Sequence, residues 1–480
     1  MSDIAEIQVD EQERPLPPPP PPIRSALTDG PILRTLLSLA WPNVIGLSAG
    51  ICVVIAETSY VGRLCVEALA AMALVFPTII LTMTMSGGAM GGAVASAIAR
   101  ALGAGNRERA GILAVHAMLI GISFGLVFML GMLIFGPRLL EMLGGRGDVL
   151  AHAIAYTQVF FGGAVLPWLL NTMAGILRGT GNMKLPSFLI LNSAAWQIVL
   201  GGTLGLGLGP VPQFGMRGVA AGALIAYIMN IGIMAWYLFS GRARITLKLR
   251  GLRIQWAMFF DILKVGAIAC FSPLQSVLTI SIFTHMLAQF GTAILAGYGV
   301  GARLEFLLTS IAFSFGIACV PMVGMAIGAG RIARARRIAW TASVAAFVAV
   351  GAPACLVAIF PDLWVNMFTD SVAVRAASHQ YLSTVGPFYA FFGLATTMYF
   401  SSQGAAKVIG PVLAQTARLI YIAGIGWWLS THGASAQSFF WLAASSMVVL
   451  GLLSCSSVVL TRWGPRETRP AIRPALSATD

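Results

Sequence analysis

Charged side chains are scarce in this chain, since only 10% of its 480 residues are Asp, Glu, Lys or Arg. A soluble domain carries about 25% charged residues. Because so few charges cannot cover a water-facing surface, the composition excludes an ordinary soluble domain. The hydrophobic share is 58%. Together these values predict a protein whose outer surface faces lipid.

Patterns that bind metals or carry out catalysis are also lacking. The six cysteines and five histidines are scattered, with no CxxC pair and no Cys/His spacing of a metal site. The apolar segments are predicted to hold no HExxH, GxSxG or paired-aspartate arrangement of an intramembrane enzyme. We therefore expect no metal, no cofactor and no enzymatic activity. The cysteines are interpreted as small apolar packing residues.

Long apolar segments, in contrast, recur along the whole length. Each is long enough to cross a hydrocarbon core of roughly 30 Å as a helix. The sequence therefore predicts an all-α polytopic membrane protein with twelve transmembrane helices. These lie near residues 35–62, 68–97, 110–136, 150–177, 186–209, 217–240, 263–288, 293–325, 337–360, 377–402, 410–430 and 436–461.

The net charge of +13 is distributed unevenly along the predicted topology. With the N-terminus inside, the inner loops and tails hold 23 of the 30 Lys and Arg residues, and the outer loops hold five. The remaining two, Arg303 and Arg418, fall within predicted helices. This positive-inside bias predicts a multi-pass protein of the cell inner (plasma) membrane with both termini in the cytoplasm. The expected partners are the lipid bilayer and a small-molecule substrate rather than nucleic acid, and the oligomeric state stays open.

The chain divides into five predicted parts. Residues 1–32 form a cytoplasmic tail in which Pro17 to Pro22 predict a polyproline II segment, either a solvated tail or a partner-binding one. A first lobe of six helices follows at 33–240, and an interfacial amphipathic linker at 241–262. A second lobe of six helices covers 263–461, and 462–480 form a second cytoplasmic tail.

The two lobes are related by an internal repeat. ALGAGNRERA at 101–110 and AIGAGRIARA at 326–335 share six of ten residues at an offset of 225, which also relates Gly179 to Gly404 and Pro186 to Pro411. The offset contains six helices, an even number, so both halves have the same orientation. The repeat is therefore parallel, about an axis along the membrane normal. Two rigid lobes that rock about their seam would carry out transport by alternating access.

Several segments in both halves have the pattern of one transporter family. They are LAWPNVIG at 39–46, ETSYVGRL at 57–64, EALAAMALVFP at 67–77, ARALGAGNRERA at 99–110, ILRGTGNMKLP at 176–186, AGYGVGARLEF at 296–306, VPMVGMAIGAG at 320–330 and FFGLATTMYFSSQGA at 391–405. With these segments the chain resembles the multidrug and toxic compound extrusion (MATE) family. The resemblance implies an outward-facing V-shaped pair of lobes. It also implies an antiporter, driven by protons or sodium, that exports amphipathic and often cationic compounds.

Four charged residues fall within predicted helices: Glu57, Arg303, Glu305 and Arg418. A charge at mid-bilayer costs at least about 2.5–3.5 kcal/mol, so such residues are functional candidates. Glu57 occupies the place where the family pattern has an aspartate. It is predicted to take a proton from the outer side and to release cargo as its charge disappears. The alternative is a glutamate that snorkels to the interface near Arg63.

Pro42 is predicted to be a hinge of the first helix, because proline lacks an N–H and kinks helices. It precedes Glu57 by fifteen residues, roughly 22 Å along a helix at about 1.5 Å per residue. The helix could therefore bend in response to protonation of Glu57.

The fifth helix departs from the family pattern of an asparagine followed four residues later by an aspartate. Asn192 is present, but Trp196 stands where the acid is expected. Because sodium needs several oxygen ligands, a single acid favours a proton as the driving ion, with sodium as the alternative. Trp196 could stack on a flat or cationic substrate or simply pack against a neighbour.

Other polar residues of the predicted helices could line a substrate cavity. Such groups more often hydrogen-bond a neighbouring helix, and both interpretations stay open. The predicted cavity residues are Tyr60, Asn171, Asn192, Trp196, Gln197 and Gln275, the last near the place of a family glutamate.

In the second lobe, Glu305 is the remaining acid within a helix. Arg303, two residues away, does not share its helix face, whereas Arg418 could reach it inside the bundle. The pair could be structural, or Glu305 could be a second proton-coupling site.

These observations predict a proton-coupled antiporter that exports amphipathic, cationic small molecules by alternating access. The alternatives are sodium-coupled export and a lipid-linked precursor flippase of the same superfamily. A flippase is expected to have further helices at its C-terminal end and several basic residues facing the cavity.

Overall fold

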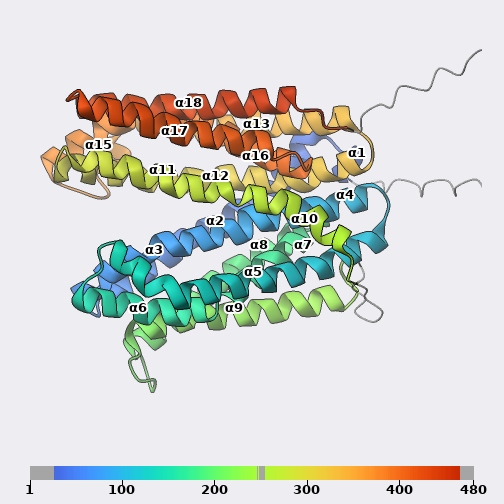
Figure 1. Cartoon of the computed structure of the whole chain (residues 1–480), viewed down its shortest axis with the longest axis horizontal. Coiled ribbons are helices and arrows are strands. Elements are labelled where there is room, and N and C mark those ends of the chain that lie inside the picture. The colour runs from blue at the N-terminus through green and yellow to red at the C-terminus, as the bar shows by residue number, and fades with distance from the viewer. Residues whose placement is uncertain (1–25, 246, 248–253, 465–480) are drawn as a thin grey trace, which may run out of the picture.

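The computed structural model of this protein describes residues 26–245, 247 and 254–464. The Pro17–Pro22 segment, most of the second tail and part of the predicted linker lie outside these residues. Regular structure in the described part is entirely helical, arranged as two side-by-side bundles (Figure 1). The fold class predicted from the sequence is thereby confirmed.

The first lobe begins with a single helical turn, α1. Its elements are α1 (Ala26–Asp29), α2 (Ile32–Gly62), α3 (Val66–Met83), the π-helix η1 (Thr84–Met90), α4 (Gly91–Gly103), α5 (Arg107–Met142), α6 (Gly147–Gly162), α7 (Val165–Gly179), α8 (Lys184–Leu206) and α9 (Gly215–Phe239).

The second lobe follows in the same order of helices. Its elements are α10 (Trp256–Ala269), α11 (Phe271–Ala288), α12 (Thr292–Gly328), α13 (Ile332–Ile359), α14 (Asp362–Val365), α15 (Val372–Val385), the 3₁₀ turn η2 (Gly386–Phe388), α16 (Tyr389–Gly404), α17 (Ile409–Thr431) and α18 (Ala436–Leu460).

Twelve helical passes can be traced through these elements. Ten helices of the described chain are long and apolar enough to cross a membrane, and the bent pair α6 and α7 makes an eleventh pass. The one further pass, the tenth in chain order, is α15 with η2 and α16. Arg375, His379 and Gln380 make α15 more polar than the other passes.

Two passes are less regular than the sequence predicted. The fourth bends by 47° between α6 and α7, where Gly162 and Gly163 favour a break and Pro167 cannot donate to a helical carbonyl. The second contains η1 between α3 and α4. A π-helical turn leaves some carbonyl groups without their usual helical partners, and such turns often occur at functional sites.

The seventh pass begins earlier than expected. Helix α10 starts at Trp256, so the last residues of the predicted linker 241–262 are the first turns of this pass. It continues into α11 after Cys270.

The repeated sequence segments form the same structure in each lobe. Gly105 and Gly330 both have positive φ, 78° and 74°, which glycine adopts without steric cost. Each glycine lets the chain reverse, so α5 begins at Arg107 and α13 at Ile332. In the first lobe Asn106 caps the new helix, because its Oδ1 accepts the N–H of Arg109 at 2.8 Å.

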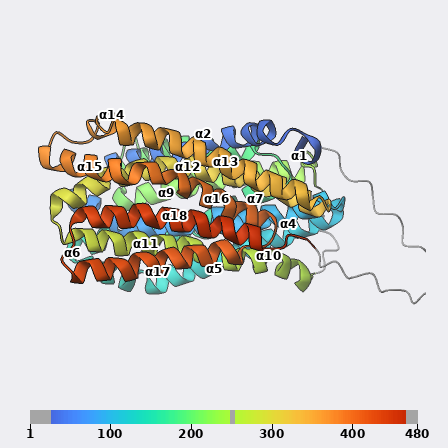
Figure 2. The ribbon, with the colours of Figure 1, turned by 90° about the horizontal axis from the view of Figure 1, so that it is seen from above.

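Both repeat turns lie at the end of the bundle where the described chain begins and ends, here called the terminal end (Figures 1 and 2). The opposite end, with the α5–α6 connection, is called the distal end. The lobes pack closely through α4 and α12, where Gly324 faces Ala99. Toward the distal end the ribbons of α6 and α15 lie apart (Figure 1).

Candidate coupling and substrate site

Glu57 lies near the distal end of α2, and its residue is only 5% exposed. Gln197 of α8 donates a hydrogen bond from Nε2 to Glu57 Oε1 at 2.7 Å. Ala49, Val53 and Ala194 form a small apolar cluster nearby on the same two helices. The carboxyl group is therefore inside the first lobe, with an amide as its hydrogen-bond partner.

Two tyrosines that were not predicted also surround this carboxyl group. Tyr156 of α6 and Tyr227 of α9 are buried and interact electrostatically with Glu57. They bring α6 and α9 to the same place as α2 and α8. Sequence gave no signal for them, because a tyrosine in an apolar helix is ordinarily a packing residue.

Asn192 is engaged between two helices of the first lobe. Its Nδ2 donates to Asn230 Oδ1 at 3.0 Å, and Asn230 in turn donates to the carbonyl of Ala226. Trp196, one turn further along α8, is 39% exposed. Its indole is thus available for contact with lipid or a ligand, whereas the Asn192 amide is used in α8–α9 packing.

Tyr60 and Asn171 lie apart from each other. The ring of Tyr60 packs on α8, where a Cβ added to Gly202 would lie 3.0 Å from it. Asn171 of α7 donates to Ser86 Oγ of η1 at 2.9 Å. Asn171 therefore contacts the π-helical turn rather than the surroundings of Glu57.

Pro42 lies within α2, which is continuous from Ile32 to Gly62. The next residue, Asn43, makes hydrogen bonds within α2 and to α8. Its Nδ2 donates to Leu39 O at 3.2 Å, and its Oδ1 accepts from Ser187 Oγ at 2.9 Å. The predicted hinge is thus held to α8 in this conformation.

The second lobe holds Glu305 in a group of tyrosines. Tyr389 donates to Glu305 Oε2 at 3.3 Å, and the hydroxyl groups of Tyr389 and Tyr381 are 3.2 Å apart. Arg418 is buried and interacts electrostatically with Glu305, while its Nε donates to Ser446 Oγ at 3.3 Å. Among the described residues, Glu305 makes no ion pair within 4.0 Å.

The other two predicted residues of this lobe have separate surroundings. The guanidinium of Arg303 lies 4.8 Å above the ring of Phe368. Gln275 of α11 donates to Thr416 Oγ1 of α17 at 2.6 Å. Neither group is brought to Glu305 by a hydrogen bond of the described chain.

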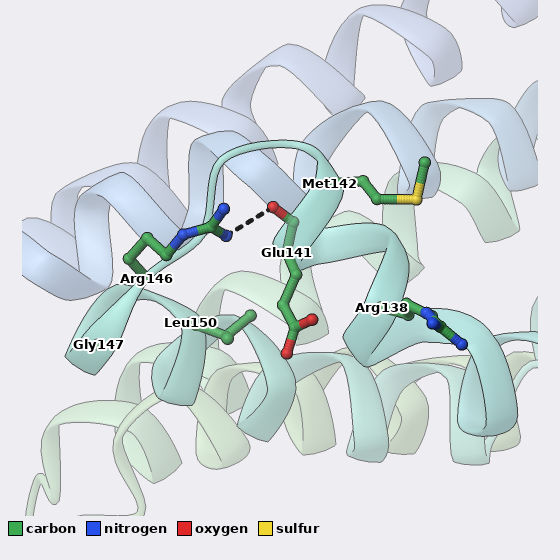
Figure 3. Close-up of a pocket in the computed structure, with 6 residues that line it drawn as sticks. All are labelled: Arg138, Glu141, Met142, Arg146, Gly147 and Leu150. Carbon is green, nitrogen blue, oxygen red and sulfur yellow. Dashed lines mark hydrogen bonds between the residues drawn. The ribbon is translucent and has the colours of Figure 1, made fainter.

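A surface pocket of about 480 Å³ lies at the distal end, between the end of α5 and the start of α6 (Figure 3). Arg146 donates to the carbonyl oxygen of Glu141 there at 2.8 Å. None of the predicted site residues lines this pocket. Its lining residues are Arg138, Glu141, Met142, Arg146, Gly147 and Leu150.

Two further features bear on catalysis. The segment GLSAG at 46–50 has the spelling of a GxSxG motif, but it lies inside α2. A nucleophile elbow requires a turn between strand and helix, so the motif has no such context. Within the described residues, no three His, Cys, Asp or Glu side chains come together as metal ligands.

The fold and its interior define the class of protein. Two parallel six-helix lobes, with buried carboxyl groups inside membrane-length helices, are the architecture of a secondary transporter. The MatE family model matches residues 47–203 and 269–428, one stretch in each lobe. The chain therefore belongs to the MATE family, whose members are transporters and not enzymes.

Individual relatives agree with this assignment. The chain is 27% identical over 320 residues to the FAD transporter of Shewanella oneidensis, covering 65% of this chain and 69% of that protein. It is 26% identical over 447 residues to the probable multidrug resistance protein NorM of Deinococcus radiodurans, covering 88% and 94% of the two chains.

Solved structures share the fold. A transporter of the MOP superfamily from Pyrococcus furiosus has a TM-score of 0.83 at 22% identity, covering 91% of this chain and 98% of that one. An outward-facing MATE family transporter of the same superfamily has a TM-score of 0.82 at 23% identity, with the same coverage.

Proposed function

We propose that this transporter is a proton-coupled antiporter that exports amphipathic, cationic small molecules by alternating access. The observation that carries the proposal is the buried Glu57 carboxyl group with a single amide donor, Gln197. Burial disfavours the charged form of a carboxyl group, so this position suits a group that gains and loses a proton. A change of charge there would alter how the first lobe binds a cation.

A proton, rather than sodium, is the proposed driving ion. The amide nitrogen of Gln197 donates a hydrogen bond to Glu57. An amide NH₂ group is a hydrogen-bond donor and cannot ligate a cation. Asn192 uses its amide on Asn230, away from the carboxyl group. Sodium-coupled export remains the alternative, and it would require additional oxygen ligands around Glu57.

The terminal end is proposed to face the cytoplasm of the cell and the distal end the outside. Lys and Arg side chains gather at the terminal end, among them Arg100, Arg109, Arg331 and Arg334. Cytoplasmic loops of inner-membrane proteins carry such an excess. Glu57 would then receive its proton from the outside, through the distal end.

Glu305 is proposed to be a second proton-coupling group. Its one hydrogen bond comes from Tyr389, a neutral donor, and the nearby Arg418 is within electrostatic reach but makes no ion pair with it among the described residues. A purely structural pair would be expected to show direct contact between the two charges.

Trp196 is the proposed aromatic contact for the substrate, because its indole is 39% exposed. The relatives point to two kinds of cargo, since one is named an FAD transporter and another a probable multidrug resistance protein. Ethidium, a flat cation, and FAD, a flat anion, are therefore the probes that separate the two.

The test uses purified protein in liposomes with an imposed proton gradient directed from the distal to the terminal side. Wild-type protein is expected to move ethidium against the direction of proton flow, and Glu57→Gln to abolish this movement while the yield of folded protein is unchanged. Glu141→Gln, at an exposed acid of the distal end, is the matched control. Coupled export by Glu57→Gln at the wild-type rate would contradict the proposal, and movement of FAD but not ethidium would replace its substrate class.

A further inference from the structure

Helix α10 belongs to the second lobe by sequence, yet it packs against α4, α5 and η1 of the first lobe. Asp261, halfway along α10, is bound by two arginines of that lobe. Arg100 Nη2 lies 3.1 Å from one carboxylate oxygen and Arg109 Nη2 lies 3.1 Å from the other. Lys264, on α10 itself, adds a third cation at 2.8 Å. One carboxylate therefore joins α10 to both α4 and α5.

His116 of α5 holds the beginning of the same helix. The residue is fully buried, and its Nδ1 is 2.8 Å from the carbonyl oxygen of Ile112. A carbonyl can only accept, so Nδ1 carries the proton and Nε2 is the acceptor. Nε2 accepts the backbone N–H of Gln255 at 3.1 Å, and the ring packs edge-on against Phe259 at 4.8 Å.

A corresponding set of contacts holds the start of the first lobe. Arg331 Nη1 contacts Asp29 Oδ1 at 2.5 Å, and Arg334 Nη2 donates to the carbonyl of Gly30 at 2.6 Å. Both arginines lie at the beginning of the second lobe's α13, whereas Asp29 is the last residue of α1 and Gly30 is separated from α2 by Pro31. The start of each lobe is thus bound, at the terminal end, by residues of the other lobe.

The repeat relates the two sets of contacts. Adding 225 to Gly30 gives Gln255, and adding 225 to Arg109 gives Arg334. The offset thus relates one bound position and one arginine of each set, although their partners differ, since Arg334 binds Gly30 whereas Arg109 binds Asp261 and His116 binds Gln255. Each set joins residues of the two lobes, so both oppose a separation of the lobes at the terminal end.

We propose that these two sets form a paired closure of the terminal end. The first cross-lobe cluster, at the start of the first lobe, consists of Asp29, Gly30, Arg331 and Arg334. The second cross-lobe cluster, around α10, consists of Arg100, Arg109, His116, Gln255 and Asp261. Both must separate before a passage can open between the lobes at that end. The inference rests on alternating access as proposed above, and it adds the groups that set the balance between the two conformations.

Arg100 is the residue on which the stability of the second cross-lobe cluster depends most. The arginine side chain is 15% exposed, and it also bonds Ser96, whose hydroxyl donates to the carbonyl of Gly404 of the second lobe at 3.1 Å. Removing the Asp261 charge leaves this guanidinium without its acid. Charge-assisted hydrogen bonds are worth enough to change a population by about tenfold or more.

The test measures the distance between the lobes directly in the full-length protein in lipid nanodiscs. Spin labels at Arg107→Cys and Arg337→Cys, both exposed at the terminal end, are placed in a variant whose six native cysteines are replaced and whose fold is verified. Asp261→Asn is expected to raise the population with a longer label distance about tenfold. Asp261→Glu should restore most of the wild-type distribution. Glu108→Gln, an exposed acid at the start of α5, should leave it unchanged.

Milder variants keep the proposal testable if Asp261→Asn does not fold. Arg109→Gln and Arg334→Gln, one in each cluster, should each lengthen the distance in part, and the double variant should do so more than either. His116→Leu should act in the same direction, whereas His116→Gln, whose carbonyl can accept from Gln255, should not.

Unchanged distances in the folded Asp261→Asn, Arg109→Gln and Arg334→Gln proteins would overturn the inference. The measurement needs neither substrate nor a proton gradient. If the transport assay contradicts the proposed role of Glu57, the distance measurement is therefore unaffected. If coupled transport is intact and the distances are unchanged, only the proposed closure is overturned.

Discussion

Gly103 and Gly328 make the same contact in opposite directions across the seam between the lobes. A Cβ added to Gly103 would lie 2.2 Å from the carbonyl oxygen of Met325, and one added to Gly328 would lie 2.1 Å from that of Arg100. The 225-residue offset exchanges the two glycines and also the two carbonyl groups. The pseudo-twofold axis therefore passes between α4 and α12 at this crossing.

We expect Gly103→Ala and Gly328→Ala to weaken the closed terminal end to a similar degree. Real Cβ atoms do not approach a backbone oxygen this closely, so the helices must move apart. Overpacking of this kind costs about 1–3 kcal/mol. The label distance between positions 107 and 337 should lengthen in both variants.

Gly131→Ala is the matched control for the two glycines. It lies within α5, and nothing would be within 4 Å of its Cβ. Because alanine has the higher helix propensity, this variant should keep the wild-type distance and gain up to about 1 kcal/mol of stability. If the label distances in Gly103→Ala and Gly328→Ala both stay as short as in the wild-type protein, the two glycines are not needed for the close approach of α4 and α12.

The hydrogen bond between Gln197 and Glu57 can be examined by a double-mutant cycle. Gln197→Met leaves the buried carboxyl group without its donor, and leaving a buried acceptor without its partner costs about 1–3 kcal/mol. Thermal unfolding in detergent should show this loss. In the Glu57→Gln background the same change should cost clearly less, because the carboxyl acceptor is gone.

The control for this cycle is Gln213→Met, at an exposed position before α9, which should change stability by less than about 0.5 kcal/mol. Additive effects of Gln197→Met and Glu57→Gln would mean that the two side chains do not interact in solution.

Sequence predicted the elements that depend on local pattern and missed contacts made far along the chain. The spans followed from apolar length, and the repeat followed from one offset. The Gln197–Glu57 bond joins residues 140 positions apart, and no local period reports such a pairing. Gln197 was predicted only as a cavity residue, without its partner.

Asp261 is a second residue whose contacts with distant positions could not be predicted from the sequence. It fell within the predicted linker 241–262, where basic and aromatic residues indicated an interfacial segment. Its binding partners Arg100 and Arg109 are 161 and 152 positions away. The π-helical turn η1 was also not foreseen, because TMSGGAM continues the apolar segment without a change of period.

Glu305 and Tyr389 provide a test of the second lobe. If Glu305 takes part in coupling, Glu305→Gln should reduce proton-driven ethidium export severalfold while the protein stays folded. Tyr389→Phe, which removes its hydroxyl donor, should have a smaller effect in the same direction. Transport by reconstituted protein and the melting temperature are measured together.

A purely structural role for Glu305 gives a different pattern. The melting temperature would then fall in Glu305→Gln, and the coupled export per folded molecule would stay at the wild-type value. Thr309→Val, at a polar residue of the same helix, serves as the control for changes in α12 that do not touch the acid.

Asp362 of α14, outside the membrane-spanning helices, makes a pH-dependent contact with α15 at the distal end. Arg375 donates to its Oδ1 at 3.1 Å, and His379 Nε2 lies 3.0 Å from the same oxygen. The hydrogen bond from Arg375, helped by the charges of His379 and Arg375, holds the pKa of the Asp362 carboxyl below its usual range. Because the pKa is lowered in the folded state, the contact stabilises the folded state at pH values above the ordinary aspartate pKa of about 3.9. This stabilisation is lost as the pH falls below that value.

Hydrogen exchange of residues 362–379 reports this contact directly. After correction for the intrinsic exchange rate, protection should not fall between pH 7 and about pH 5, and it should fall below about pH 4. Asp362→Asn should show the lower protection at every pH, because the amide cannot carry the charge that binds Arg375. Asp370→Asn, in the same connection, should retain the wild-type profile. A wild-type profile in Asp362→Asn would mean that the carboxylate does not hold α14 to α15.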